Sequence, residues 1–473
     1  MASTPDAVVV GSGPNGLAAA IVLAGAGLRT RVREAKPTIG GGLRSAELTL
    51  PGFVHDVCSA VHPLACSSPF FRSLPLARYG LEWIQPPAPL AHPLDGGTAA
   101  VLKRSVEETA RRLGPHGRDW ARLFGAFARD WDALAGDVLA PPLHLPRNPL
   151  MMARFGLEAL LPATVLARAL RDTPARALFA GNAAHAFLPL QQPGTAAFGV
   201  LLSVAGHAVG WPIARGGSQR FADALVAHLR SLGGEVETGA PVERLEELRP
   251  ARIVVFDLGP HQVARIARGL LPKGYRRRLE RYRYGSAAFK LDWALDGPVP
   301  WAAPECLRSA TVHLGGTLEE IVESEAAHER GEVHERPFVL FVQPTLFDPT
   351  RAPPGRHTAW AYCHVPNGWS GDASDLIERQ VERFAPGFRQ RILARSVITP
   401  AEFERRNANL VGGDVNGGAM DLAQVFRRPV VGATPYRTPL RGVYLCSAST
   451  PPGGGVHGMG GYFAAQTALA DLG

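Results

Sequence analysis

The chain opens with a short apolar run, a glycine-rich turn and a second, longer apolar run. Residues 7–10 are Ala-Val-Val-Val, residues 11–16 are Gly-Ser-Gly-Pro-Asn-Gly, and residues 17–27 are rich in alanine and end in glycines. The β-branched run predicts a buried strand and the alanine-rich run predicts a helix. A second strand is expected over 29–33, closed by Glu34. This alternation of strand, turn, helix and strand predicts an α/β fold.

Each glycine of the turn has a physical purpose. Gly11 permits the tight turn, Gly13 lets the backbone approach a pyrophosphate, and Gly16 lets the helix pack on the strand. The pyrophosphate would lie at the helix N-terminus, where free N–H groups and the helix dipole favour negative charge. Glu34 follows 18 residues after Gly16, where a carboxylate accepts hydrogen bonds from ribose hydroxyls and disfavours the 2′-phosphate of NADP. The alternative is a glycine-rich turn that binds nothing.

Further glycine-rich segments follow, each beside a predicted strand or helix. The first is Gly40-Gly41-Gly42, with Arg44 two residues later. The segment 211–220 precedes a predicted helix over 221–233, and the last segment is a loop over 447–461 before a helix that starts near Tyr462. The additional strands that the pattern predicts are 234–237, 241–243, 252–257 and 442–446.

Together these segments resemble the extended FAD signature of the amine oxidase and phytoene desaturase superfamily. Segments 55–63 and 409–420 are most similar to its phytoene dehydrogenase-like branch. In that family an arginine usually follows two glycines directly, whereas here a third glycine stands in that place and Arg44 comes later. The resemblance implies FAD as the cofactor, held by Gly11, Gly13, Pro14, Asn15, Gly16, Glu34, Ala35, Gly41, Gly42, Arg44, Val242, Ser449, Gly458 and Met459.

The resemblance also implies two domains that are discontinuous in sequence. We expect residues 1–85, 206–285 and 401–473 to form a Rossmann-like FAD-binding domain. Residues 86–205 and 286–400 would form a mixed α+β substrate domain, helical in its first part and strand-rich in its second.

Three side chains are candidates for catalysis. Lys290 resembles the lysine that holds a water against flavin N5 in monoamine oxidases, although a partly exposed lysine paired with Asp292 is an equal alternative. His457 lies in the loop that would face the flavin, and His62 follows the segment that usually passes over it. Both can titrate near neutral pH, and a structural histidine is the alternative for each.

Composition and charge narrow the class of protein further. The chain has 473 residues and a formal net charge of +8, with the basic residues scattered, so we expect no nucleic-acid partner. Its cysteines are odd in number and include no CxxC pair, which argues against a disulfide framework, a metal site and a dithiol redox centre. Neither a signal peptide nor an apolar run of membrane-spanning length is evident, so we expect a cytoplasmic protein. Residues 150–171 predict an amphipathic helix broken near Pro162 that packs in the core, lines a substrate tunnel or lies on a membrane as a peripheral contact.

The expected function is that of an FAD-dependent dehydrogenase or desaturase, which takes hydride from an apolar substrate of isoprenoid or polyene type to flavin N5. Because the chain shows no second dinucleotide-binding turn, electrons are expected to pass to oxygen or a quinone, or to return to the substrate in an isomerisation. An FAD-dependent amine oxidase is the nearest alternative. A non-redox isomerase or a prenyl-binding escort-like protein is the alternative from another class.

Overall fold

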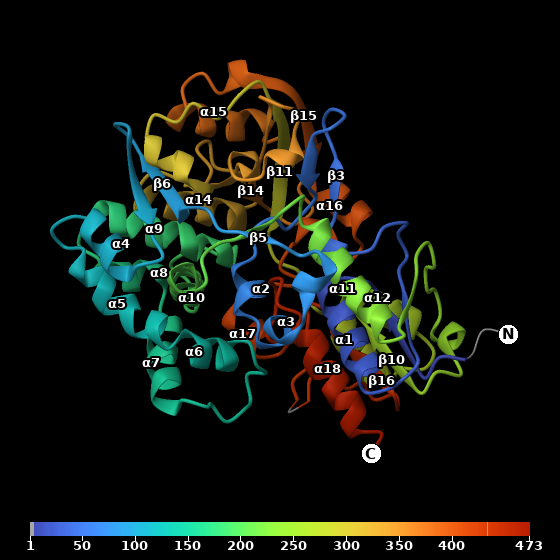
Figure 1. Ribbon diagram of the computed structural model, residues 1–473. Coiled ribbons are helices and arrows are strands. Elements are labelled where there is room, and N and C mark those ends of the chain that lie inside the picture. The colour runs from blue at the N-terminus through green and yellow to red at the C-terminus, as the bar shows by residue number, and fades with distance from the viewer. Residues whose placement is uncertain (1–3, 433) are drawn as a thin grey trace.

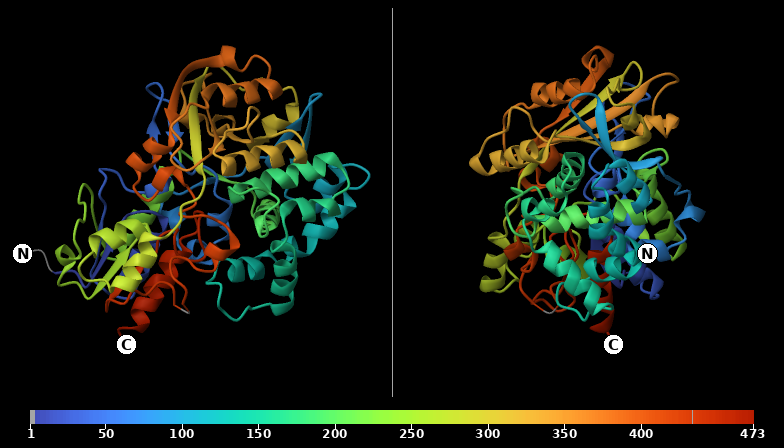
Figure 2. Two further views of the ribbon diagram at one scale, coloured as in Figure 1. Left: turned by 180° about the vertical axis from the view of Figure 1, so that it is seen from behind. Right: turned by 90° about the vertical axis from the view of Figure 1, so that its left-hand side faces the viewer.

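Two β-sheets and a lobe of helices make up the molecule. A computed structural model describes residues 4–432 and 434–473. Figure 1 shows one sheet at the lower right, around β10 and β16, and the other at the top, around β11 and β14, with helices α4 to α10 to the left. Seen from behind and from the side, the two sheets remain at opposite ends of the molecule (Figure 2).

The lower sheet has five strands in the order β16-β10-β1-β2-β9, and every neighbouring pair is parallel. Short apolar strands that alternate with helices form a parallel sheet, because each helix carries the chain back to the end of the sheet where the previous strand began. The predicted α/β, Rossmann-like class is therefore confirmed. The strands are β1 (Ala7–Val10), β2 (Thr30–Arg33), β9 (Glu235–Glu237), β10 (Ile253–Phe256) and β16 (Val443–Leu445).

The register of this sheet brings four strand ends to one edge. Val10 lies opposite Arg33 and Phe256, and Phe256 lies opposite Leu445. The carboxyl ends of parallel strands are where ligands bind in open α/β sheets. The residues that follow these strands, and so meet at this edge, are Gly11, Glu34, Asp257 and Cys446.

Helices cover both faces of the five-stranded sheet. Ala7 and Val9 belong to an apolar cluster with α1, α11 and α18, whereas Val8 and Val10 belong to a cluster with α12 and α13. Alternate side chains of β1 thus point to opposite cores, as the period of a strand requires. These helices are α1 (Pro14–Gly25), α11 (Gln219–Ser231), α12 (Pro260–Ile266), α13 (Lys273–Glu280) and α18 (Met459–Ala470).

The upper sheet has seven strands in the order β15-β11-β14-β13-β12-β6-β7. The β12–β6 pair is parallel and the other neighbouring pairs are antiparallel. The strands are β6 (Ala88–Leu94), β7 (Thr98–Leu102), β11 (Ala287–Leu295), β12 (Ser309–Leu314), β13 (Val339–Val342), β14 (His357–Val365) and β15 (Ile392–Ile398).

The two faces of this sheet differ in character. Phe289, Leu291 and Trp293 of β11 are buried in an apolar cluster that includes α15 (Ser374–Phe384). Lys290 and Asp292 alternate with them and therefore project from the opposite face. One face of the sheet thus builds a core, and the other carries polar and aromatic side chains toward the rest of the molecule.

The helical lobe has its own apolar core, centred on side chains such as Trp120, Phe124 and Phe179. The break predicted near Pro162 is present: the helices before and after it are bent by 101°. Within the described residues no single helix is long and apolar enough to cross a membrane, although this bent pair passes that test when its two helices are taken together. The lobe contains α4 (Val106–Arg112), α5 (Arg118–Arg129), α6 (Trp131–Val138), α7 (Pro149–Ala159), α8 (Ala163–Leu166), α9 (Thr173–Ala183) and α10 (Thr195–Ala208).

Short elements connect these parts. The pair β3 (Ser45–Glu47) and β4 (Val54–Asp56) is antiparallel, and so is the pair β5 (Trp83–Ile84) and β8 (Ile213–Ala214). All strands of the five-stranded sheet fall within the segments proposed for the FAD-binding domain, and those of the seven-stranded sheet fall within the other segments. The remaining helices are α2 (Pro63–Ser67), α3 (Pro69–Ser73), α14 (Leu318–Ala327), α16 (Pro400–Arg406) and α17 (Leu422–Val425).

Two details of the sequence prediction are wrong. Residues 241–243 are not a strand: the Glu243 amide donates to the Glu247 carboxylate instead of joining a sheet. The C-terminal helix begins at Met459 and not near Tyr462, because Gly458 adopts a left-handed conformation (φ 68°) and starts the helix three residues earlier.

The crossing of α1 and α18 depends on a missing side chain. A Cβ added at Gly461 would overlap the carbonyl oxygen of Asn15 on α1, whereas one added at Gly25, at the other end of α1, would meet open space. We expect Gly461→Ala to lower the free energy of unfolding by about 2 kcal/mol or more, because the two helices must separate. Gly25→Ala should change it by less than about 1 kcal/mol. Thermal unfolding of the two variants tests this, and equal midpoints would contradict the close packing.

Candidate functional site

A cavity of about 530 Å³ lies between the two sheets and is lined by residues from both. One end contains the turn after β1 and the residues that follow β2 and β10. The other end is formed by side chains of β12, β13 and β14 together with the helical lobe. We call these the dinucleotide end and the far end.

The glycine turn presents bare backbone to the dinucleotide end. Gly11 has a φ of 102°, a conformation that favours glycine. Gly13 has no side chain with which to cap α1; Pro14 carries no N–H and the Gly16 amide donates to Asp257, so the Asn15 amide is the one of the first turn that remains available to an anion. Gly13, Pro14 and Asn15 line the cavity, whereas Gly16 does not; a Cβ on Gly16 would overlap the Gly11 carbonyl oxygen. Gly16 therefore serves helix packing, as predicted.

The second glycine cluster packs directly on the first. Gly41 has a φ of 56°, and a Cβ added to it would lie 3.0 Å from the Cα of Gly13. Gly41 and Gly42 both line the cavity. The two glycine clusters thus form one continuous backbone wall, which bulkier residues would disrupt.

Glu34 is buried at the same end, with Ala35 beside it on the cavity wall. One carboxylate oxygen accepts hydrogen bonds from the amide and hydroxyl of Ser12, at 3.0 and 2.5 Å, and the other accepts one from the Lys36 amide at 2.9 Å. These bonds fix the carboxylate at the cavity wall, where ribose hydroxyls are its natural partners.

Arg44 lines the cavity but is held by protein groups. Its guanidinium forms an ion pair with Glu34 at 3.2 Å and donates to the carbonyl oxygens of Thr38 and Arg406. Arg44 therefore neutralises Glu34 in this structure. Because its guanidinium is bonded to protein groups, it is not available to bind a phosphate.

Asp257 is a cavity residue that the sequence analysis missed. It follows β10, and its carboxylate accepts a hydrogen bond from the Gly16 amide at 3.0 Å. Its Oδ2 would lie 2.5 Å from a Cβ at Gly13. Burial, together with the nearby Glu34 carboxylate, raises the pKa of Asp257 to about 8. An acid directly after the strand that pairs with β1 is the signal that could have revealed it.

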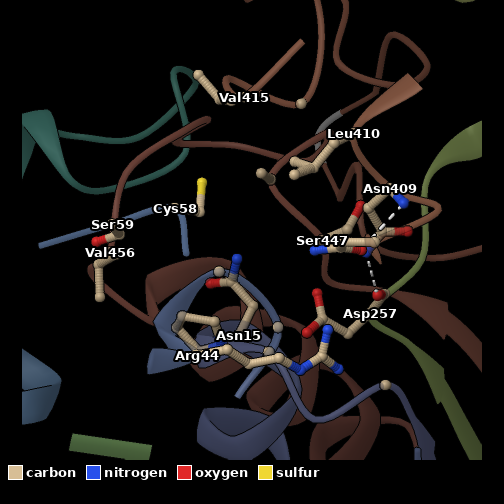
Figure 3. A pocket seen from close by; sticks show the side chains of 18 of the residues that line it. Asn15, Arg44, Cys58, Ser59, Asp257, Asn409, Leu410, Val415, Ser447 and Val456 are labelled. Carbon is tan, nitrogen blue, oxygen red and sulfur yellow. Dashed lines mark hydrogen bonds between the residues drawn. The ribbon is translucent and has the colours of Figure 1, made fainter. Parts of the chain in front are cut away.

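Asn409 joins this end of the cavity to a distant part of the chain. Its side-chain amide donates to the Asp257 carbonyl oxygen at 2.9 Å, and its carbonyl oxygen accepts from the Gly259 amide at 2.8 Å. Figure 3 shows Asn409 directed toward Asp257, with Ser447 beside it. In the sequence, segment 409–420 resembles the family, but its residue spacing does not predict a contact between Asn409 and Asp257.

The remaining predicted cofactor residues divide into two groups. Val242 and Ser449 line the cavity, and the Ser449 hydroxyl donates to the Gly417 carbonyl oxygen at 2.8 Å. Gly458 and Met459 do not line it: Gly458 lies against Phe71, and Met459, the first residue of α18, is buried in the core beside the parallel sheet.

The two histidine candidates have different environments. His457 has both ring nitrogens engaged, since the Met459 amide donates to Nδ1 and Nε2 lies 3.2 Å from the Gly453 carbonyl oxygen. It steadies the C-terminal loop and does not line the cavity.

His62 does line the cavity. The hydroxyl of Ser218 donates to the Ser59 carbonyl oxygen at 2.6 Å, so Nε2–H of His62 donates to Ser218 at 2.9 Å. The Nδ1 atom of His62 has no partner and is the unprotonated nitrogen. Burial lowers the pKa of His62 to about 4, so the ring is neutral at pH 7.

Lys290 is fully buried and does not line the cavity. Its Nζ lies 2.5 Å from both carboxylate oxygens of Asp292 and 5.0 Å from the centre of the Trp360 ring. Burial lowers the pKa of Lys290 and raises that of Asp292 to about 6. The pairing with Asp292 that sequence offered as an alternative is thus present, but the lysine is buried and not partly exposed.

The far end of the cavity is aromatic and carries no formal charge. Trp211, Trp360 and Tyr362 line it, and the last two stack with ring centres 6.0 Å apart. His185 also lines it and is neutral at pH 7, because burial lowers its pKa to about 3. All the acidic, lysine and arginine side chains among the described lining residues belong to the dinucleotide end, namely Arg33, Glu34, Lys36, Arg44, Asp257 and Arg265.

One buried group of metal-ligand type lies elsewhere, around Glu325. Its Oε2 is 2.6 Å from Nδ1 of His364 and 3.7 Å from Nε2 of His328. The shorter separation is that of a hydrogen bond, and it is smaller than the distance of about 3.3 Å between two ligands of one tetrahedral zinc. We therefore describe the group as a buried hydrogen-bonded pair with a second histidine beside it.

Known proteins resemble the chain at three levels. Residues 9–74 match a family model described as an NAD(P)-binding Rossmann-like domain. The chain is 27% identical to pyridine nucleotide-disulfide oxidoreductase domain-containing protein 2 of Mus musculus, over 99% of the chain and 94% of that protein. It is also 27% identical to phytoene dehydrogenase of Streptomyces griseus, over 95% of the chain and 92% of that protein.

Solved structures share the fold across nearly the whole chain. An oxidoreductase from Methanosarcina mazei superposes with a TM-score of 0.64 at 17% identity, over 98% of this chain and 99% of that one. Cyclohexylamine oxidase from Brevibacterium oxydans IH-35A superposes with a TM-score of 0.60 at 16% identity, over 99% of both chains.

The parallel sheet, the glycine turn and these similarities define an oxidoreductase with a Rossmann-like dinucleotide site. Within that class, the chain is similar in sequence to phytoene desaturases and to a phytoene dehydrogenase, and it shares the fold of cyclohexylamine oxidase.

The raised pKa of Asp257 predicts how stability depends on pH. The folded protein binds a proton on Asp257 up to about pH 8, whereas the unfolded chain releases it near pH 4. Folded stability is therefore lost as pH rises from about 4 to about 8, by on the order of 3–5 kcal/mol from this group. Asp257→Asn keeps an acceptor for the Gly16 amide and should remove this loss. Calorimetry of both cofactor-free proteins at pH 5 and pH 9 tests it, and parallel falls in melting temperature would contradict it.

Proposed function

We propose that the dinucleotide of this cavity is FAD. The lining fits such a molecule: the positive end of the α1 dipole and the Asn15 amide suit a pyrophosphate, Glu34 suits the adenosine ribose, and Val242 borders the same end. The lining then continues without interruption to the loop at 447–456 and to the far end, so the cavity extends beyond what the adenosine half needs. The contact between Gly41 and Gly13 supports an extended ligand along both glycine clusters.

We further propose that the protein is a dehydrogenase or desaturase for an apolar substrate, of isoprenoid or polyene type. The single observation that carries this proposal is the uncharged aromatic far end, which is continuous with the dinucleotide end. A charged molecule must give up the hydration of its charge when it enters a cavity with uncharged aromatic walls, whereas a neutral apolar molecule has no such cost. When bound, the flavin would supply hydride acceptance at N5, and electrons would leave to oxygen or a quinone.

The side chains of the chain then have limited roles. Trp211, Trp360 and Tyr362 orient the substrate by apolar contact and exclude water. His62 forms part of the cavity wall as a neutral ring whose Nε2–H is already engaged by Ser218. Lys290 is paired with Asp292 two residues along the same strand, and we propose no contact between Lys290 and substrate. In this proposal, 1–85, 206–285 and 401–473 hold the cofactor, and 86–205 and 286–400 hold the substrate together with Trp211 of the first set.

An amine oxidase is the second candidate, favoured by the shared fold with cyclohexylamine oxidase and by the stacked Trp360–Tyr362 pair. Against it, no carboxylate among the described residues lines the far end, so an ammonium group would meet no counter-charge there. The same cavity would also suit a non-redox isomerase, which would leave the flavin oxidised after turnover.

Anaerobic reduction of the purified protein tests the substrate class. We expect an absorption band at about 450 nm, typical of bound flavin. This band should bleach when a polyene or an isoprenoid is added. Primary amines should leave it unchanged. Bleaching by amines alone would establish the amine oxidase, and turnover of a polyene without bleaching or an electron acceptor would establish the isomerase.

The variant Gly13→Glu tests where the pyrophosphate binds. The added carboxylate would stand at the N-terminus of α1, beside Asp257 and against the phosphates, because a Cβ at Gly13 already lies 2.5 Å from Asp257 Oδ2. We expect this variant to bind FAD more weakly by a factor of about 100 or more. Gly25→Glu, at the exposed end of the same helix, is the matched control and should stay yellow. A Gly13→Glu protein with full flavin content would refute the placement.

A further inference from the structure

Two histidines form a pair at the far end of the cavity. His185 lies in the short helical turn Ala184–Ala186 that follows α9, and His313 lies on β12. Their Nε2 atoms are 3.1 Å apart, and their ring centres are 5.1 Å apart. His185 is half-buried and lines the cavity, whereas His313 is fully buried behind it. The pair thus connects the cavity wall with the interior of the protein.

Both rings are neutral at pH 7. Burial lowers the pKa of His185 to about 3 and lowers the pKa of His313 well below its usual range. A neutral imidazole has one N–H group and one unprotonated nitrogen. Because the two Nε2 atoms are within hydrogen-bond distance, one of them donates and the other accepts. The direction of this bond therefore determines which nitrogen of His185 carries its proton.

The surroundings of His313 determine that direction. Its Nδ1 atom is enclosed and has no hydrogen-bond partner among the described residues. It lies against Gly181 of α9, where an added Cβ would be only 2.7 Å away. An N–H group at this position would have no acceptor, whereas an unprotonated nitrogen can accept a weak contact from the Cα–H of a glycine. Nε2 of His313 consequently carries the proton and donates to Nε2 of His185.

His185 then presents a hydrogen-bond donor to the cavity. Since its Nε2 accepts from His313, its own proton is on Nδ1. This Nδ1 makes no hydrogen bond to a described residue and is not enclosed by them. The indole N–H groups nearby differ from it: that of Trp211 donates to the Leu202 carbonyl oxygen at 3.3 Å, and that of Trp360 is enclosed. The wall around His185 is therefore apolar except for one free N–H group.

Tyr362 offers a second donor at the far end, in different surroundings. Its hydroxyl has no hydrogen-bond partner among the described residues and is not enclosed. Tyr362 packs on the same apolar cluster as Cys58, and that cluster includes Leu410. The ring of His185, by contrast, packs against Trp211 with ring centres 5.8 Å apart. A ligand oxygen beside Trp211 would thus meet His185.

A metal ion does not explain the histidine pair. Structural and catalytic zinc sites use at least three protein ligands. Within the part of the chain that the structure describes, no third histidine, cysteine or carboxylate joins His185 and His313 in a ligand cluster. The free N–H group of His185 is therefore available to an organic ligand.

We propose that His185 is a specificity-determining residue, whose Nδ1–H binds an uncharged oxygen, carbonyl or hydroxyl, at the end of an otherwise apolar substrate. This inference rests on the proposed function and narrows its substrate class. A plain hydrocarbon would leave the N–H group unpaired in an apolar wall, whereas a substrate with a terminal oxygen would satisfy it. A site built to bind a polar atom discriminates against the analogue that lacks it for this reason.

Ligand binding to the FAD-loaded protein tests the inference. The probes share one carbon skeleton: farnesol, farnesal and the corresponding triene without oxygen. Dissociation constants are measured anaerobically from the change in flavin absorption with probe concentration, whether the band shifts or bleaches. We expect farnesol and farnesal to bind about tenfold more tightly than the triene. Farnesal is informative because its carbonyl oxygen can accept a hydrogen bond but cannot donate one.

Two substitutions of His185 give a matched comparison. His185→Phe keeps a flat ring without the donor and should reduce the preference for oxygen to about twofold or less. His185→Asn keeps an amide N–H group near the position of Nδ1 and should retain most of the preference. Each preference is a ratio measured on one protein, so a general loss of cavity shape weakens all probes and leaves the ratio unchanged. The probes on the original protein suffice if neither variant folds.

Four results would overturn the inference. The original protein binds the triene as tightly as both oxygenated probes, or it prefers farnesol and not farnesal, which would make His185 an acceptor. In the third, the preference survives His185→Phe and is lost in Tyr362→Phe, which would assign the oxygen to Tyr362. These three leave the proposed dehydrogenase function intact. In the fourth, no probe changes the flavin spectrum, which would refute an isoprenoid substrate and this inference together.

Discussion

The close approach of three backbone segments at the end of β1 is the constraint on which the site depends. The turn at Gly11, the start of α1 at Gly13 and the second cluster at Gly41 touch through backbone atoms, and Asp257 closes the remaining side. Any side chain there would separate the strands from α1. The buried Glu34 and its ion pair with Arg44 depend on the same contacts, since both are anchored to the segments that the glycines bring together.

The two sheets divide the chemistry of the cavity between them. The parallel sheet and the segments that follow its strands contribute the charged groups, with Glu34 and Asp257 directly after the carboxyl ends of β2 and β10. The seven-stranded sheet contributes the side chains of one of its faces. On β14, Trp360 and Tyr362 point to the cavity wall, and Ala361 between them points into the core beneath α15. The polarity of the cavity therefore changes along its length because two different strand patterns form its ends.

Sequence predicted what is local and missed what is distant. Gly11 to Glu34 could be assigned because turn, helix and acid follow one another within one unit, and each residue type has a single conformational reason to be there. Asp257 and Asn409 meet across 152 residues, and His185 reaches the far end from a helical segment, so no spacing indicates them. Lys290 was recognised by pattern, but its distance from the cavity follows from the sheet face on which it lies. The 241–243 segment resembled a strand by composition, and only its hydrogen bonds to Glu247 show otherwise.

The packing of α18 against α1 means that the ends of the chain are structurally one element. The cavity wall uses residues from Val10 to Val456, and α18, which supports the first turn of α1, is synthesised long after α1. On the ribosome, β1 and α1 must therefore wait, with their apolar faces uncovered, until α18 has been made. Contacts of such long sequence separation form slowly. The cavity wall is therefore completed only after α18 has been made, and until then the incomplete sheet exposes apolar surface that is prone to aggregation.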